Sequence, residues 1–204
     1  MSNDSYRMAF TTGGLFHPES VRLAALYLDL GDWSAVRAQV IADNLLQART
    51  LSTLQRLCRE VVSRLRTLGL GELGCLVAGN PQEQAALLWL AVCRRYRFIA
   101  EFASEVLRER YISLQPDVTP EDFDAFFNRK AEWHPELDGL TLATRAKLRQ
   151  VLFRILREAD LLADNHRINP VLLSQRLLAA IPRDRRQELL YFPVSVADLK
   201  EMTQ

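Results

Sequence analysis

The pattern of apolar and polar residues along this 204-residue chain predicts a succession of amphipathic helices. The clearest one spans Thr50 to Leu68, where apolar residues recur at spacings of three and four and therefore form one stripe of an α-helix. The same periodicity predicts further helices over residues 18–30, 33–42, 81–111, 120–133, 141–159 and 170–181, and a short one at 194–202. The expected fold class is all-α.

The polar side of the helix expected at 50–68 is strongly basic. It carries four arginines, Arg56, Arg59, Arg64 and Arg66, against a single acid, Glu60, so its local charge is +3. Short hydrogen-bonding side chains occupy its first turns. Such a helix resembles one that enters a DNA major groove, although an ordinary solvated arginine surface is the alternative interpretation.

A second basic helix favours the DNA interpretation. Shifting the chain by 91 residues places Thr50 on Thr141 and Thr53 on Thr144, and the shared pattern is T-L-small-T-x-x-basic-L. The helix expected at 141–159 carries five cations before its first acid, Glu158. Leucines at helical spacing match easily by chance, so the matched polar positions are the informative part of this internal similarity.

We therefore predict a contact surface for double-stranded DNA on these two helices. The cations would neutralise phosphates, while the shorter polar side chains and Arg145 could approach base edges. The predicted contact residues are Arg49, Ser52, Thr53, Gln55, Arg56, Arg59, Thr144, Arg145, Lys147, Arg149 and Arg154.

The order of the expected helices suggests two helix-turn-helix-like elements around a long central helix. We expect a flexible start (1–12), an N-terminal helix-turn-helix-like subdomain (13–79), a central packing helix region (80–115) and a C-terminal helix-turn-helix-like subdomain (116–204). The central helix could break near Cys93, and residues 161–168 could form a small wing or an irregular connection. The first turn is longer than the usual length of about 3 to 4 residues, which weakens that assignment.

Three glycines at 69, 71 and 74 match the spacing G-x-G-x-x-G. A dinucleotide site needs that motif between a strand and a helix, whereas here it follows an arginine-rich helix. We expect a helix C-cap and a compact loop over residues 68–80 instead.

The net charge of +1 argues against coating of nucleic acid by excess charge, so DNA binding requires segregated charge. Segregation is present, because residues 117–138 hold seven acids against two bases. A protein-interaction adaptor is the alternative from another class, in which the arginines meet acidic partner surfaces. An RNA-binding helical domain is a third hypothesis.

Other kinds of site have little support in the sequence. The three cysteines, Cys58, Cys75 and Cys93, indicate buried free thiols in a reducing cytoplasm. No histidine has metal-ligand spacing, and no catalytic motif occurs, so we expect no metal, no cofactor and no enzymatic activity. The start of the chain lacks an export signal, and the longest apolar run, 85–93, is far shorter than the roughly 20 residues of a membrane span. A cytoplasmic monomer is expected.

Several short motifs are distributed over residues 12–173 of the chain. They are Gly13-Gly14, Asn44-Leu45-Leu46-Gln47, Arg64-Leu65, Tyr96-Arg97-Phe98, Glu101-Phe102, Lys130-Ala131, His134-Pro135 and KLRQVLFRILREA at 147–159. Together these motifs resemble the BrxA family, small core proteins of bacteriophage-exclusion (BREX) defence systems. Asp160 departs from the resemblance, because the family would have glycine there.

The resemblance implies an all-α, DNA-binding protein with helix-turn-helix elements. Its system would methylate host DNA and block the replication of unmethylated phage. Other BREX subunits would be its partners: a methyltransferase, a large ATPase, a phosphatase-like protein and a Lon-like protease.

Overall fold

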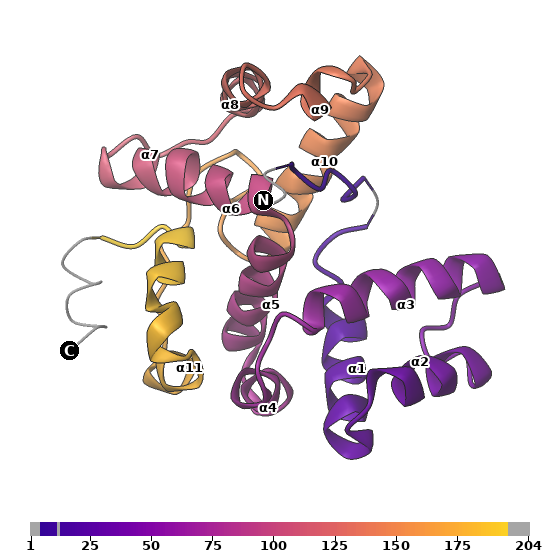
Figure 1. Cartoon of the computed structure of the whole chain (residues 1–204). Coiled ribbons are helices and arrows are strands. Elements are labelled where there is room, and N and C mark those ends of the chain that lie inside the picture. The colour runs from indigo at the N-terminus through magenta and orange to yellow at the C-terminus, as the bar shows by residue number, and fades with distance from the viewer. Residues whose placement is uncertain (1–4, 12, 196–204) are drawn as a thin grey trace. The chain divides into compact units, whose positions relative to one another are not determined.

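The structure, a computed structural model, describes residues 5–11 and 13–195 and confirms the all-α fold class (Figure 1). Within these residues the only β-type pairings are two isolated bridges. The helices are α1 (His17–Leu30), α2 (Trp33–Ala42), α3 (Leu51–Leu65), α4 (Leu70–Ala78), α5 (Pro81–Arg95), α6 (Arg97–Phe102), the π-helical η1 (Ala103–Arg108), α7 (Glu109–Ile112), α8 (Pro120–Ala131), α9 (Pro135–Asp138), α10 (Leu142–Glu158), α11 (Gln175–Ala180) and the 3₁₀ helix η2 (Arg183–Tyr191).

Contacts within the chain define two compact units. Unit 1 comprises the described parts of residues 1–15, 92–172 and 182–204, and unit 2 comprises residues 16–91 and 173–181. The basic helix α3 belongs to unit 2 and the basic helix α10 to unit 1, so each is described within its own unit. The subdomain boundaries expected from the sequence stay a prediction.

Unit 2 is built around α1, which contacts α2, α3 and α4, while α4 also contacts α11. Leu23, Val36 and Val61 are fully buried in its core. At the corner between α1 and α2, the ring of Trp33 stacks on that of Tyr27 with 4.0 Å between centroids. The outer side of α3 is left free of this packing.

Unit 1 has an aromatic core centred on Phe98, whose ring contacts those of Tyr6, Phe123, Phe126 and Phe127. The N-terminal segment is held at both ends by carboxylates. The backbone N–H of Tyr6 donates to Glu136 Oε1 at 2.6 Å, and that of Leu15 donates to Glu158 Oε2 at 2.5 Å. Glu158 lies in α10, so this segment is tied to the second basic helix.

The prediction of a compact loop over residues 68–80 is wrong, because residues Leu70–Ala78 form the helix α4. Gly69 lies just before the helix, and its backbone N–H donates to Glu72 Oε2 at 2.7 Å. Leu73 and Leu76 are buried, so their burial outweighs the low helix propensity of the glycines. At Gly71, an added Cβ would lie 3.8 Å from the carbonyl oxygen of Ala180, which indicates a close approach to α11.

The long helix expected at 81–111 is interrupted at Tyr96, three residues beyond the suggested position. Tyr96 has an extended backbone (φ −126°, ψ 92°), and its buried ring contacts Phe10 with 5.3 Å between centroids. The helix is thus interrupted at the residue whose aromatic ring packs into the core. The chain then continues through α6, the π-helical η1 and α7.

Three predictions near the C-terminus have different outcomes. Residues 161–168 form an irregular connection closed by an isolated bridge between Leu162 and Ile168, not a wing with strands. The helix expected at 170–181 is shorter, because it begins only after Ser174, whose hydroxyl oxygen accepts the N–H of Leu177. Most of the helix expected at 194–202 lies outside the described residues.

Candidate nucleic-acid interface

The N-terminus of α3 is fixed by its N-cap residue, Thr50. Its hydroxyl oxygen accepts the backbone N–H of Thr53 at 3.2 Å and lies 2.9 Å from the Thr53 hydroxyl oxygen. An N-cap of this kind satisfies one of the free N–H groups of the first turn. The side chains that follow it therefore extend from a defined helix start.

Five predicted contact residues of α3 come together on one surface. Each is exposed, and they line a shallow depression of about 450 Å³, which we call the α3 face: Ser52, Thr53, Gln55, Arg56 and Arg59. The opposite side of the helix is the buried stripe that contains Leu54, Cys58 and Val61. Within the described residues, Arg56 and Arg59 have no carboxylate partner, so their charge is not compensated by the protein.

Arg64 does not join the α3 face, although the sequence placed it on the polar side. Only 3% of its side chain is exposed, and its Nε donates to Glu60 Oε1 at 2.8 Å. Its guanidinium also lies over the ring of Phe16, 5.1 Å from the centroid. The charges of Arg64 and Glu60 offset each other, so the exposed positive charge comes from other arginines.

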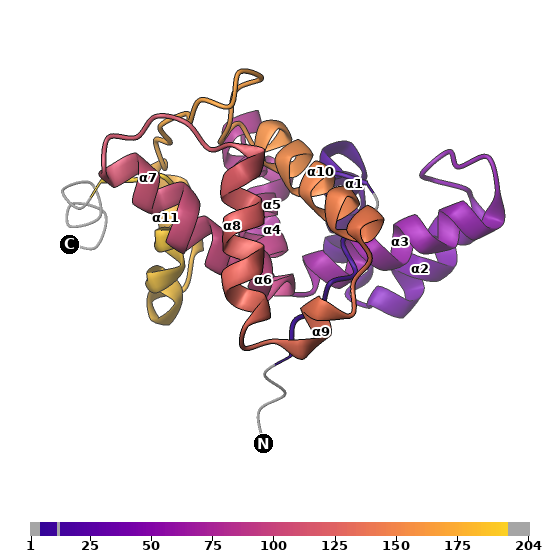
Figure 2. The ribbon, with the colours of Figure 1, turned by 90° about the horizontal axis from the view of Figure 1, so that it is seen from above.

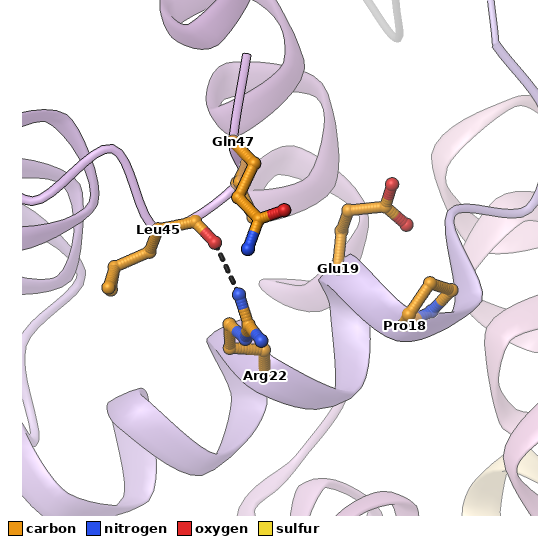
Figure 3. Close-up of a pocket in the computed structure, with 6 residues that line it drawn as sticks. Pro18, Glu19, Arg22, Leu45 and Gln47 are labelled. Atoms are coloured by element: carbon orange, nitrogen blue, oxygen red, sulfur yellow. Dashed lines mark hydrogen bonds between the residues drawn. The ribbon is translucent and has the colours of Figure 1, made fainter.

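The connection before α3 is held by hydrogen bonds to backbone groups, as Figure 3 shows for Arg22 and the carbonyl oxygen of Leu45. The amide of Asn44 bonds the backbone N–H and carbonyl of Ala48 at 3.0 and 3.1 Å. The predicted contact residue Arg49 follows directly and is exposed. The connection between α2 and α3 is therefore longer than the usual turn, but hydrogen bonds hold its backbone in place.

Helix α10 begins with the same cap as α3. The hydroxyl oxygen of Thr141 accepts the N–H of Thr144 at 3.1 Å and lies 2.9 Å from the Thr144 hydroxyl oxygen. Thr144 is half-buried, and this bond occupies its hydroxyl. The capping part of the internal similarity is thus present in both helices.

A second basic surface lies on α10. Lys147 and Arg154 line a depression of about 290 Å³ together with Gly13 and Val151. We define the α10 face as Lys147, Gln150, Arg154 and Arg157. Its charge is partly compensated, since Arg154 pairs with Glu158 at 2.6 Å and Arg157 lies 3.8 Å from Asp164, whereas Lys147 donates to the neutral Gln150 at 3.0 Å.

Arg145 and Arg149 lie elsewhere, because both bond to Asp124 of α8. Figure 2 shows the ribbons of α8 and α10 beside each other. Arg145 donates from Nε to Asp124 Oδ1 at 2.9 Å, from Nη2 to the Asp124 carbonyl oxygen at 2.9 Å and from Nη1 to Asn128 at 2.7 Å. Its guanidinium lies 4.5 Å from the ring centroid of Phe127. Arg149 pairs with the same Asp124 carboxylate.

The 91-residue shift explains this division of the α10 cations. Lys147 corresponds to the exposed Arg56, whereas Arg145 corresponds to the buried Leu54, and Arg149 corresponds to the buried Cys58. Arg145 and Arg149 therefore occupy packing positions of the shared pattern. The sequence prediction omitted two residues of the α10 face, Gln150 and Arg157, although their spacing of three and ten from Lys147 places them on the same side of a helix.

Other functional groups are few in the described part of the chain. The three cysteines are free and buried, as predicted, and burial raises the pKa of each thiol. Among these residues no group of histidine, cysteine and acidic side chains could hold a metal ion. Within the same residues, no helix has the length and apolar character needed to cross a membrane.

Comparison with known proteins gives consistent matches. A model of the BrxA family matches residues 4–184. A protein of Bacillus cereus (strain H3081.97) named BREX protein BrxA is 28% identical over 130 residues, covering 62% of this chain and 64% of the relative. The chain thus spans less than two thirds of that relative's length. The BREX protein BrxA of Escherichia coli O9:H4 (strain HS) is 25% identical over 193 residues, which cover 93% of this chain and 91% of the relative.

A solved structure shares the fold. It is the crystal structure of an uncharacterized protein from Magnetospirillum magneticum, with a TM-score of 0.78 and 22% sequence identity. The match covers 92% of this chain and 97% of the other.

Proposed function

Because this chain belongs to the BrxA family, we propose that it is a non-enzymatic, double-stranded DNA-binding component of a BREX phage-defence system. The name of its relatives, BREX protein BrxA, supports the assignment to such a system. One observation carries the DNA-binding part. On the α3 face, Arg56 and Arg59 lie exposed beside short polar side chains, without a carboxylate partner in the described part of the chain.

This surface has the chemistry that duplex DNA requires. Arginines that no acid compensates can neutralise phosphates and release the counterions bound there. Hydroxyl and amide side chains beside them can hydrogen-bond with phosphates or base edges. The α10 face contributes Lys147 and Arg154, while Arg145 and Arg149 hold α10 against α8.

The test is fluorescence anisotropy of a labelled random duplex, measured against salt concentration. If Arg49, Arg56, Arg59, Lys147 and Arg154 together neutralise about five phosphates, log affinity falls with log salt at a slope of about −4.5. The double variant Arg56→Glu with Arg59→Glu is expected to bind more weakly and to flatten the slope by about 2. The matched control reverses two exposed arginines outside both basic helices, Arg7→Glu with Arg183→Glu.

Two results would contradict the proposal. One is weak binding whose salt dependence is the same in wild type and in the α3 double variant. A change of the same size in the control variant would count equally against the proposal. The other is displacement of the duplex by RNA at much lower concentrations than by unlabelled DNA, which would establish an RNA-binding protein instead.

A protein-interaction adaptor is the second candidate function, and exposed apolar side chains favour it. Trp133 is 81% exposed and lies two residues beyond the end of α8, and Leu142 is 85% exposed and is the first residue of α10. Aromatic side chains such as that of Trp133 are enriched in interfaces between proteins.

A further inference from the structure

The faces of α3 and α10 differ in the side chains that could contact bases. On α3, Ser52 and Gln55 are exposed and line the depression beside the arginines. The Ser52 hydroxyl oxygen lies 3.2 Å from that of the N-cap Thr50, whereas the Gln55 amide makes no hydrogen bond within the described residues. The equivalent positions of α10, given by the 91-residue shift, are Ala143 and Ala146. The side chain of alanine can neither donate nor accept a hydrogen bond, so α10 lacks this polar pair. The one amide on the α10 face, that of Gln150, differs from Gln55 because its Oε1 already accepts a hydrogen bond from Lys147 Nζ at 3.0 Å.

The threonines near the two caps do not reduce this difference. The hydroxyls of Thr53 and Thr144 lie equally far, 2.9 Å, from their N-cap hydroxyls. Both are therefore engaged in capping, and neither helix gains an additional free polar group from them.

Gln55 is the side chain with the most specific chemistry on the α3 face. It is exposed, and its amide makes no hydrogen bond within the described residues. The neighbouring Arg56 and Arg59 can only donate, whereas a glutamine amide both donates and accepts. Adenine presents an acceptor, N7, beside a donor, the N6 amino group, in the major groove, and a glutamine can bond both.

We infer that α3 supplies the base selectivity of DNA binding, with Gln55 contacting the major-groove edge of an adenine, while α10 makes phosphate contacts only. The inference rests on the proposed DNA-binding function. Lys147 suits the second role because it is a flexible point charge, and the other two cations of the α10 face are already paired with carboxylates.

The experiment compares wild type with two variants, Gln55→Ala and Lys147→Ala, on duplexes selected from a randomised library. Wild type is expected to select an adenine at one position and to lose about tenfold in affinity when that base pair is changed. Gln55→Ala removes this preference but keeps the salt slope. Lys147→Ala weakens binding to all duplexes and flattens the slope by about 1, with the preference kept.

Two further measurements sharpen the test. Replacing the selected adenine by 7-deazaadenine removes the N7 acceptor without changing base pairing, so wild type is expected to lose affinity and Gln55→Ala is not. The control is Gln39→Ala, which removes an exposed glutamine of α2 in the same unit and is expected to behave as wild type. Alanine is a good helix former, so both glutamine variants are expected to fold.

Failure of the inference differs from failure of the proposed function. Salt-dependent binding without base preference, or a preference that survives Gln55→Ala, would overturn the inference while DNA binding stands. A preference lost in Lys147→Ala would overturn the role given to α10. No salt-dependent binding by wild type would overturn the proposed function itself.

Discussion

At the scale of single residues, the contacts of each arginine determine its role more than its position on a basic helix does. Arg145 is 20% exposed and donates three hydrogen bonds to α8, and it also lies over an aromatic ring. Arg56 has none of these contacts. The same residue type thus serves packing in α10 and offers free charge in α3.

Arg145→Ala is expected to destabilise the protein without changing DNA binding. The variant loses charge-assisted hydrogen bonds and a cation–π contact, and it leaves Asp124 with one arginine fewer, so the expected cost is about 2 kcal/mol. Urea unfolding measures this cost, and Arg154→Ala, at an exposed position of the same helix, is the control. Unchanged stability together with loss of DNA affinity would show that Arg145 contacts DNA.

Glu101 makes stability depend on pH. It accepts hydrogen bonds from Tyr6 Oη at 2.5 Å and Arg97 Nε at 2.6 Å, and its carboxylate lies 2.5 Å from Lys130 Nζ. Burial alone would raise its pKa, but hydrogen bonds from Lys130, Tyr6 and Arg97 outweigh burial and hold the pKa below the ordinary value of 4.5.

A carboxyl with a lowered folded-state pKa contributes stability above its unfolded pKa and loses that contribution as pH falls through the folded pKa. We expect Glu101→Gln to be less stable than wild type at about pH 7, and the difference to shrink toward about pH 3. Urea unfolding at both pH values measures this. A difference that is independent of pH would show that ionisation of Glu101 is unimportant.

At the scale of elements, the two basic helices share a cap and differ in the side opposite their exposed face. Both begin after a threonine whose hydroxyl accepts the N–H three residues on. The packed side of α3 is apolar apart from Arg64, which pairs with Glu60 of the same helix, whereas that of α10 includes two arginines held by Asp124 of α8. The threonine cap and the exposed cations thus occur in both helices. The residues on the packed side differ, because α3 and α10 pack against different helices.

Thr50→Ala is expected to destabilise α3 by about 1 kcal/mol, because the first turn loses its side-chain acceptor. Thr50→Ser keeps that acceptor and is expected to retain most of the stability. Thermal unfolding of the two variants measures the effect. Equal stability of both variants and wild type would mean that the cap contributes nothing.

At the scale of the whole molecule, a net charge of +1 conceals a separation of charge. Within the described residues, the arginines of the α3 face, Arg56 and Arg59, have no acidic partner. On α10, in contrast, Arg145 and Arg149 share the carboxylate of Asp124. Because screening limits exposed charges to a range of roughly 10 Å, a local surface can attract a polyanion although the whole protein is almost neutral.

A phage-challenge assay in cells carrying the complete defence system tests the function at this scale. Arg56→Glu with Arg59→Glu is expected to abolish protection while the protein still copurifies with its partners. Loss of copurification with unchanged DNA affinity would favour the adaptor instead, and Trp133→Ala then identifies its contact surface.

The sequence by itself determined the all-α class and most helix positions, because helical periodicity and N-caps such as Thr50 and Thr141 are local properties. It also located the exposed arginines of α3, since an apolar stripe defines the opposite side. Its error at α4 came from glycines whose low propensity was overridden by burial of Leu73 and Leu76.

Only the tertiary structure decided which cations remain free. Arg145 and Arg149 bond to Asp124, which lies 21 and 25 residues away in the sequence. Other contacts are equally remote: the Ser174 hydroxyl donates a hydrogen bond to Glu83, 91 residues earlier in the chain. No local pattern encodes such contacts, because they depend on how separate helices pack together. The physical reason is that a charge is offered to a ligand only when the fold places no opposite charge beside it.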